Sequence, residues 1–236
     1  MARRSASSQM NHTERVAGTV FFLIYLLVLP TLAGKLFSLA ATLLGVAISE
    51  SLQNIIFYYA LFAVTLLLFH HFIGQTTTRF FDNLGGALGT LCLGLLVFYG
   101  ANELLYRVCN VLFDSRTNLN DTAIAAQIVS APRMTALIVV VLSPFVEETL
   151  FRGLVFGCIR EKSRPAAYVI SCALFALLHV LPFFLSSHDL GYLILMLQYL
   201  VPGLIFAWAF EHSGTLWTAI LLHAVVNALS LGIILS

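Results

Sequence analysis

Polar residues whose types suit acid–base chemistry lie inside apolar stretches in the C-terminal part of this chain. They are Glu147, Glu148, Arg152, His179, His223 and Asn227. An ionisable side chain inside a membrane costs several kcal/mol, so it normally faces the interior of a helix bundle and pairs with another group. These residues are therefore the candidate site. Each alone also has a structural interpretation, because a single histidine or asparagine in a membrane helix can simply join two helices by a hydrogen bond.

The first motif is the pair of glutamates in SPFVEETLFRG. Glu148 and Arg152 are one helical turn apart and can form an ion pair on one helix face, which suits a supporting role better than a chemical one. Glu147 is turned by about 100° from Glu148, so Arg152 is not placed to neutralise it. We expect Glu147 to share a proton or a water with His179 or His223 on other helices, as a general base does.

Two further motifs lie nearer the C-terminus, FALLH and HAVVN. In the first, Phe175 precedes His179 by one helical turn and can pack beneath the imidazole. In the second, His223 and Asn227 are also one turn apart, so both side chains project the same way. Together they can present two hydrogen-bond donors to a developing oxyanion.

The elements that must position these residues are membrane helices. Of the 236 residues, 60% are hydrophobic and only 10% are charged, whereas an ordinary soluble domain has roughly a quarter charged residues. Apolar runs reach the about 20 residues that a helix needs to cross the bilayer. We predict an all-α polytopic transmembrane bundle of about seven to eight spans. The predicted spans are 16–33, 55–73, 84–105, 134–159, 165–184, 190–210 and 216–235.

Domain organisation and orientation follow from the same runs. We expect a cytosolic tail at 1–15, N-terminal transmembrane helices with an interfacial loop at 16–131, and a catalytic helix core at 132–236. The apolar segment 36–48 is short and is interpreted as interfacial. With seven spans, seven Lys and Arg lie on the side of the N-terminus and four on the other, which favours a cytosolic N-terminus. An eighth span at 36–48 would reverse this orientation.

The three motifs together resemble a known set. EETLFR is similar to the EExxxR motif of the CAAX-protease and bacteriocin-processing (CPBP, Abi-like) family of intramembrane proteases, FALLH to its FxxxH motif and HAVVN to its HxxxN motif. They occur in the family's order, and the resemblance covers about residues 140–230. It implies hydrolysis of a peptide bond within the membrane. By this resemblance Glu147 and His179 activate a water, His223 and Asn227 stabilise the oxyanion, and Glu148 and Arg152 support the site.

The resemblance also bears on cofactors and partners. Family members were first described as metalloproteases, and two histidines with a carboxylate can hold zinc. This chain has no HExxH motif and no evident third histidine in its core, so we favour a metal-free, glutamate-type protease over a zinc enzyme. The expected partners are the lipid bilayer and a membrane-associated or lipidated peptide or protein.

Other functions stay open at this stage. A net charge of +1 without a basic cluster gives no footprint for nucleic acid. A proton-coupled transporter would use buried Glu and His as a relay, but it predicts two similar halves, whereas the polar residues here lie in one half. A noncatalytic scaffold or bacteriocin-immunity protein could keep the motifs for structure. We expect a multi-pass protein in the plasma membrane of a bacterium.

Overall fold

The computed structural model describes residues 10–112, 119–187 and 195–235. Throughout these ranges the regular structure is helical and no strand is formed, which confirms the predicted all-α class. The α-helices are α1 His12–Leu23, α2 Leu29–Leu44, α3 Glu50–Leu68, α4 His70–Asp82, α5 Leu84–Leu112, α6 Leu119–Ser130, α7 Pro132–Leu137, α8 Ser143–Glu148, α9 Gly157–Arg160, α10 Arg164–Ser187, α11 Met196–Ser213 and α12 Leu216–Leu235. Three π-helical turns join some of them, η1 Ile24–Val28, η2 Ile138–Leu142 and η3 Thr149–Phe156.

The helices form a polytopic membrane bundle. Among the described residues, six helical stretches are long and apolar enough to cross a membrane. They are His12–Leu44, Glu50–Leu68, Leu84–Leu105, Pro132–Arg160, Arg164–Leu185 and Leu216–Ile233. Each overlaps a predicted span, so the chain is an integral membrane protein.

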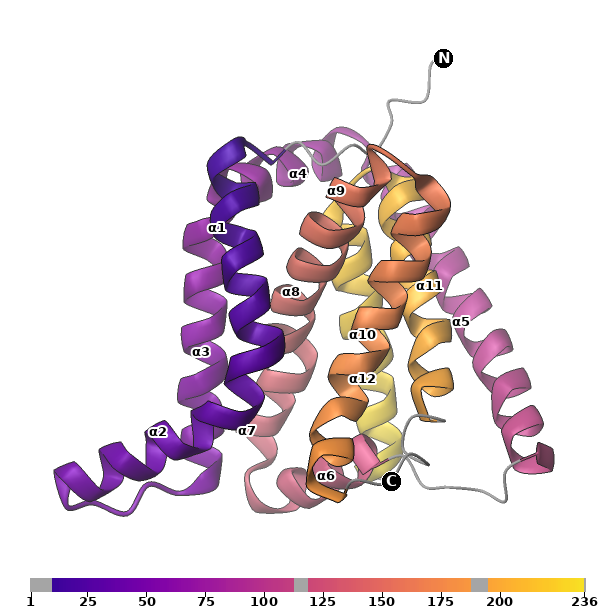
Figure 1. Ribbon diagram of the computed structural model, residues 1–236. Coiled ribbons are helices and arrows are strands. Elements are labelled where there is room, and N and C mark those ends of the chain that lie inside the picture. The colour runs from indigo at the N-terminus through magenta and orange to yellow at the C-terminus, as the bar shows by residue number, and fades with distance from the viewer. Residues whose placement is uncertain (1–9, 113–118, 188–194, 236) are drawn as a thin grey trace.

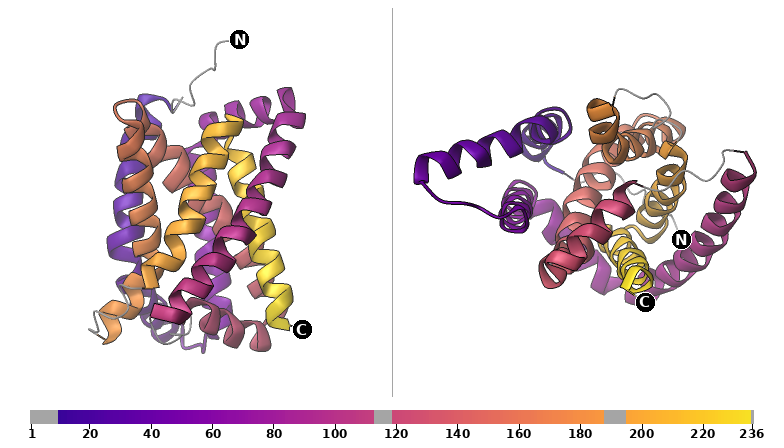
Figure 2. Two further views of the ribbon diagram at one scale, coloured as in Figure 1. Left: turned by 90° about the vertical axis from the view of Figure 1, so that its right-hand side faces the viewer. Right: turned by 90° about the horizontal axis from the view of Figure 1, so that it is seen from below.

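The remaining predicted span, 190–210, corresponds to α11, which is not among those six stretches. Polar residues such as Gln198 and Glu211 lower its hydropathy, and the predicted start of the span lies outside the described residues. α11 still runs through the bundle, where it packs against α10, α5 and α12 (Figure 2). It is a partly polar helix held by its neighbours.

The segment predicted to be interfacial forms the end of α2. After the π-helical turn η1 the chain changes direction, and α2 leans away from the bundle (Figure 1). None of its residues is buried. α2 ends at Gly45, whose φ of 65° lies in the left-handed region that glycine adopts without strain.

The helix that carries the two glutamates lies at the centre of the core. It runs from α7 through α8 to α9 and contacts α10 and α12. Leu150, Phe151 and Phe156 on it are completely buried. The π-helical turns η2 and η3 flank α8 on both sides, and such turns shift the register of side chains and are frequent at functional sites.

Helix α4 fixes the start of α12. The Thr76 hydroxyl accepts a hydrogen bond from the backbone N–H of Leu216 at 2.6 Å, and the Trp217 indole donates to the Thr77 hydroxyl at 2.7 Å. Because unpaired N–H groups at a helix start are costly inside a membrane, these bonds anchor α12. They thereby set the position of His223, which lies further along the same helix.

The bundle has two distinct ends. α4, the start of α1 and the turn between α9 and α10 lie together at one end, whereas α6 and the end of α12 lie at the other (Figure 1). An odd number of crossings places the start of the first span and the end of the last on opposite sides of a membrane. The seven predicted spans agree with this arrangement.

Candidate active site

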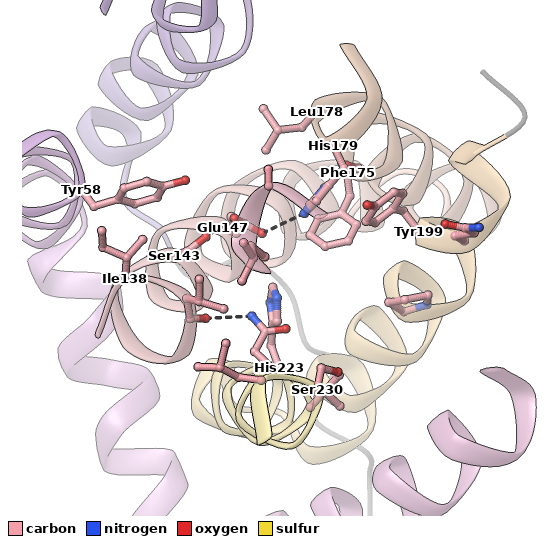
Figure 3. A pocket seen from close by; sticks show the side chains of 18 of the residues that line it. Tyr58, Ile138, Ser143, Glu147, Phe175, Leu178, His179, Tyr199, His223 and Ser230 are labelled. Atoms are coloured by element: carbon pink, nitrogen blue, oxygen red, sulfur yellow. Dashed lines mark hydrogen bonds and ion pairs between the residues drawn. The ribbon is translucent and has the colours of Figure 1, made fainter. Parts of the chain in front are cut away.

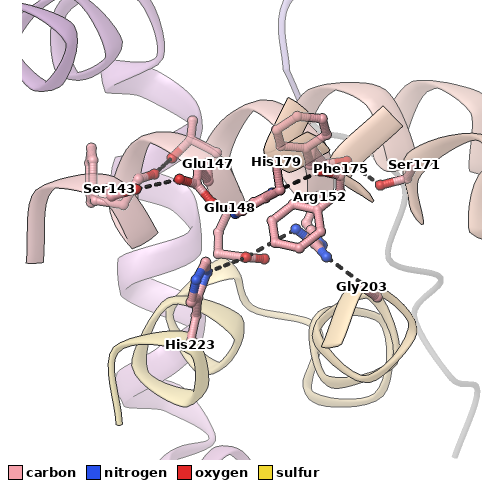
Figure 4. A network of polar contacts seen from close by, with 12 residues as sticks. Ser143, Glu147, Glu148, Arg152, Ser171, Phe175, His179, Gly203 and His223 are labelled. Atoms are coloured by element: carbon pink, nitrogen blue, oxygen red, sulfur yellow. Dashed lines mark hydrogen bonds and ion pairs between the residues drawn. The ribbon is translucent and has the colours of Figure 1, made fainter. Parts of the chain in front are cut away.

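Glu148 and Arg152 form a buried ion pair. Both side chains are completely buried, and Arg152 Nη1 lies 3.0 Å from Glu148 Oε1, as the one-turn spacing predicts (Figure 4). Arg152 Nη2 also donates to the main-chain carbonyl of Gly203 at 3.0 Å. The guanidinium lies over the Phe175 ring, 4.3 Å from its centroid, which further offsets its desolvation.

Glu148 has a second partner that the sequence reasoning missed. His223 Nδ1 lies 2.8 Å from the same Oε1 atom (Figure 4). An ionised carboxylate only accepts hydrogen bonds, so Nδ1 carries the hydrogen. The ring then carries a second hydrogen, on Nε2, only when it is protonated. The one-turn spacing could not reveal this contact, because it joins α8 to α12.

Glu147 has a different environment. The Ser143 hydroxyl donates a hydrogen bond to its Oε1 atom (Figure 4). Its Oε2 atom is buried without a hydrogen-bond partner among the described residues and lies 3.8 Å from His179 Nε2. That separation is too long for a direct hydrogen bond. Glu147 thus turns one bonded oxygen away from His179 and one free oxygen toward it.

The environment of His179 fixes which nitrogen can act as a base. Its Nδ1 atom lies 2.9 Å from the carbonyl oxygen of Phe175, and a carbonyl can only accept. In the neutral ring Nε2 is therefore an unprotonated acceptor. The imidazole packs on the Phe175 ring at 4.6 Å between centroids, as expected from the sequence, and stacks on Tyr199 at 4.5 Å.

His223 and Asn227 lie on the same side of α12, as their spacing predicts. His223 stacks on the Phe206 ring, with 4.6 Å between centroids. Asn227 Nδ2 donates to the carbonyl of Val139 in the π-helical turn η2 at 2.8 Å. An amide nitrogen carries two hydrogens, so one remains for another acceptor. The contact also joins α12 to the helix that carries Glu147.

The predicted catalytic residues line a cavity, whereas the predicted supporting residues do not. The cavity has a volume of about 550 Å³ and is lined by all four predicted catalytic residues (Figure 3). They are Glu147, His179, His223 and Asn227. Glu148 and Arg152, predicted as supporting, do not line it and lie behind the wall. A cavity of this size suits a peptide segment or small molecule, since ligand sites measure about 300–1,000 Å³.

Ser143 also lines this cavity and was missed by the sequence reasoning. It lies one helical turn before Glu147, so the spacing that paired Glu148 with Arg152 would also have found it. Its hydroxyl decides which carboxylate oxygen of Glu147 stays free. Ser143 is therefore placed to orient the predicted base.

The arrangement of potential ligands bears on whether the site holds a metal. In the described part of the chain, no group of three or more His, Cys, Asp or Glu is arranged to hold a metal ion. Glu147 and His179 approach each other at 3.8 Å, whereas His223 is bound through its Nδ1 atom to Glu148. The three residues are not gathered into the close set of ligands that holds zinc.

A comparison with protein families points to the same region. Residues 129–229 match the family described as type II CAAX prenyl endopeptidase Rce1-like. The UPF0177 protein YxdF of Lactococcus lactis subsp. lactis (strain IL1403) is 31% identical over 87 residues, which are 37% of this chain and 42% of that protein. No solved structure gives a significant match. The family match confirms the resemblance drawn from the motifs and contains all of the predicted site residues.

Proposed function

We propose that this chain, whose residues 129–229 are Rce1-like, is an intramembrane endopeptidase that hydrolyses a peptide bond of a membrane-associated or lipidated peptide or protein. One observation carries the proposal. Polar residues from three separate membrane helices line a single cavity, and there the free carboxylate oxygen of Glu147 faces the acceptor nitrogen of His179. Two acceptors side by side suit a water molecule, which would donate to both.

In the proposed reaction this water attacks the carbonyl carbon of the substrate. Glu147 takes one proton from the water while the new C–O bond forms, and His179 holds the water in place. The carbonyl oxygen becomes an oxyanion as its double bond opens. When the oxyanion collapses, the C–N bond breaks and Glu147 returns the proton to the leaving amine. The products are a carboxylic acid and an amine.

His223 and Asn227 would stabilise the oxyanion. Asn227 has one amide hydrogen left after its bond to Val139. In its protonated form His223 donates from Nε2, while its Nδ1 atom is bound to the Glu148 carboxylate. Arg152 holds Glu148 in this orientation through the buried ion pair. Preorganised donors of this kind are commonly worth about 10²–10³ in kcat each.

We propose a metal-free reaction, because a carboxylate and an imidazole suffice to activate water and no described group of three or more potential ligands is gathered around a metal position. We also propose that the protein lies in the plasma membrane of a bacterium with its N-terminus in the cytosol. The matched relative is bacterial. Arg15, Arg79, Arg160 and Arg164 belong to helices that meet at one end of the bundle, which supports the orientation.

The test is cleavage of a library of membrane-anchored peptides by the purified protein in liposomes. Wild type is compared with Glu147→Ala, His179→Ala and the control Glu103→Ala, which removes an exposed carboxylate outside the cavity. Each protein is assayed with and without a chelator. We expect the first two variants to lose cleavage while the control keeps it, and the chelator to have no effect.

Three other results would change the proposal. Loss of activity with the chelator, restored by zinc, would replace the metal-free reaction with a metalloprotease. A folded wild type that cleaves nothing, while the Glu147 variant keeps its cellular role, would favour a noncatalytic scaffold. Proton transport into the liposomes that depends on Glu147 would favour a transporter.

A further inference from the structure

The wall of the cavity formed by α10 and α11 contains a proline inside each helix. Pro182 interrupts α10 and Pro202 interrupts α11, and both line the cavity. Proline has no N–H to donate to the carbonyl four residues earlier. The carbonyls of Leu178 and Gln198 therefore lack their regular helical donor, and these two residues line the same cavity.

Gln198 adds a third acceptor at this wall. Its side-chain Oε1 atom is buried and has no hydrogen-bond partner among the described residues. An unpaired acceptor inside a membrane protein is costly, so it normally marks a place where water or a ligand binds. Leu178 and Gln198, which together carry these three acceptor oxygens, thus line one cavity from two neighbouring helices.

Outside the proposed catalytic residues, the described lining of the cavity offers no charged partner for a side chain of a ligand. Apart from tyrosines, its ionisable residues are Glu147, His179 and His223, and no described Lys, Arg or Asp lines it. Many of the other lining residues are aromatic or aliphatic. A charged ligand side chain would lose its hydration here without compensation.

An extended peptide segment meets these conditions. Its main-chain N–H groups are donors at regular spacing, and alternate ones point to the same side. We propose that Leu178, Pro182, Gln198 and Pro202 form an acceptor wall that binds the main-chain N–H groups of an extended, uncharged peptide segment beside the scissile bond. This inference rests on the proposed function and names how its substrate is held.

If the acceptor wall recognises the main chain of the peptide, many uncharged peptide sequences should bind. A peptide that lacks a main-chain N–H at the contacting position should bind poorly. A proline or an N-methylated residue at the contacting position removes the donor and also introduces bulk. The same change one residue further along the peptide points to the other side, where the acceptor wall makes no contact. Sensitivity should therefore alternate along the peptide.

The probe is a fluorescent peptide of alternating alanine and leucine attached to a lipid chain, with a set of analogues that each carry one N-methyl group. Binding and cleavage are measured separately in liposomes that contain the full-length protein. Pro202→Ala restores an N–H that can satisfy the Gln198 carbonyl, and alanine favours the helix, so this variant should fold. Gln198→Met removes Oε1 at similar volume. Leu197→Ala is the control, because Leu197 is exposed and does not line the cavity.

We expect each of the two wall variants to weaken binding by about fivefold, the usual effect of one lost hydrogen bond, and to leave kcat nearly unchanged. The control should bind like wild type, and N-methylation should weaken binding at alternate positions. Binding that shows this pattern without any cleavage would keep the acceptor wall and overturn the protease. Cleavage that is indifferent to the variants and to N-methylation would keep the protease and overturn the acceptor wall. A peptide that neither binds nor is cleaved would overturn the acceptor wall.

Discussion

Replacing Arg152 by methionine tests whether the buried ion pair is a support of the site. The change removes a cation that is completely buried, 3.0 Å from Glu148 Oε1 and 3.0 Å from the Gly203 carbonyl. It leaves Glu148 as a buried carboxylate held only by His223. Breaking a buried pair in this way costs about 3–5 kcal/mol. For a chain of this length we expect Tm to fall by roughly 10 °C.

The double variant Glu148→Gln with Arg152→Met separates the charge from the packing. It removes both charges, so the remaining cost is mainly the Gly203 carbonyl without its donor, about 1–3 kcal/mol. We therefore expect the double variant to be more stable than Arg152→Met by about 2 kcal/mol. Unfolding of the purified proteins in mixed detergent micelles, followed by circular dichroism, measures both. Equal stability of the single and double variants would refute the reasoning.

Further predictions concern the catalytic residues and the packing of α1. Ser143→Ala should lower kcat by roughly tenfold with little change in Tm, because Glu147 loses a charge-assisted hydrogen bond. Ser143→Thr keeps the hydroxyl and should restore activity. Equal kcat for wild type and Ser143→Ala would contradict this prediction. Asn227→Ala should lower kcat by about 10²–10³ at similar KM, as steady-state kinetics can show. Gly18→Ala should destabilise by about 1–3 kcal/mol, since its Cβ would lie 2.5 Å from a buried phenylalanine ring. Gly34→Ala, in open space, should show no such loss in the same unfolding assay.

The sequence predicted well those features that depend on one helix. Hydropathy indicated the spans because each must cover the bilayer by itself. The ion pair of Glu148 with Arg152 and the packing of Phe175 on His179 follow from residues one turn apart. The structure contains both contacts.

Contacts between helices were not predictable in the same way. The pairing of Glu148 with His223 depends on how α8 and α12 approach each other, which no spacing along the chain encodes. The weak hydropathy of α11 likewise reflects polar residues such as Gln198 that face a cavity rather than lipid. Sequence reasoning treated 190–210 as an ordinary span, because hydropathy does not show which face of a helix is buried.

The position of the cavity makes the protein asymmetric across the membrane. Its lining residues come from the half of the bundle nearer α6 and the end of α12, whereas Arg152 and Phe156, further toward α4, are completely buried. Completely buried side chains therefore lie between the proposed active site and the end of the bundle formed by α4. With the proposed cytosolic N-terminus, the cavity lies nearer the outer face of the membrane than the cytosolic one.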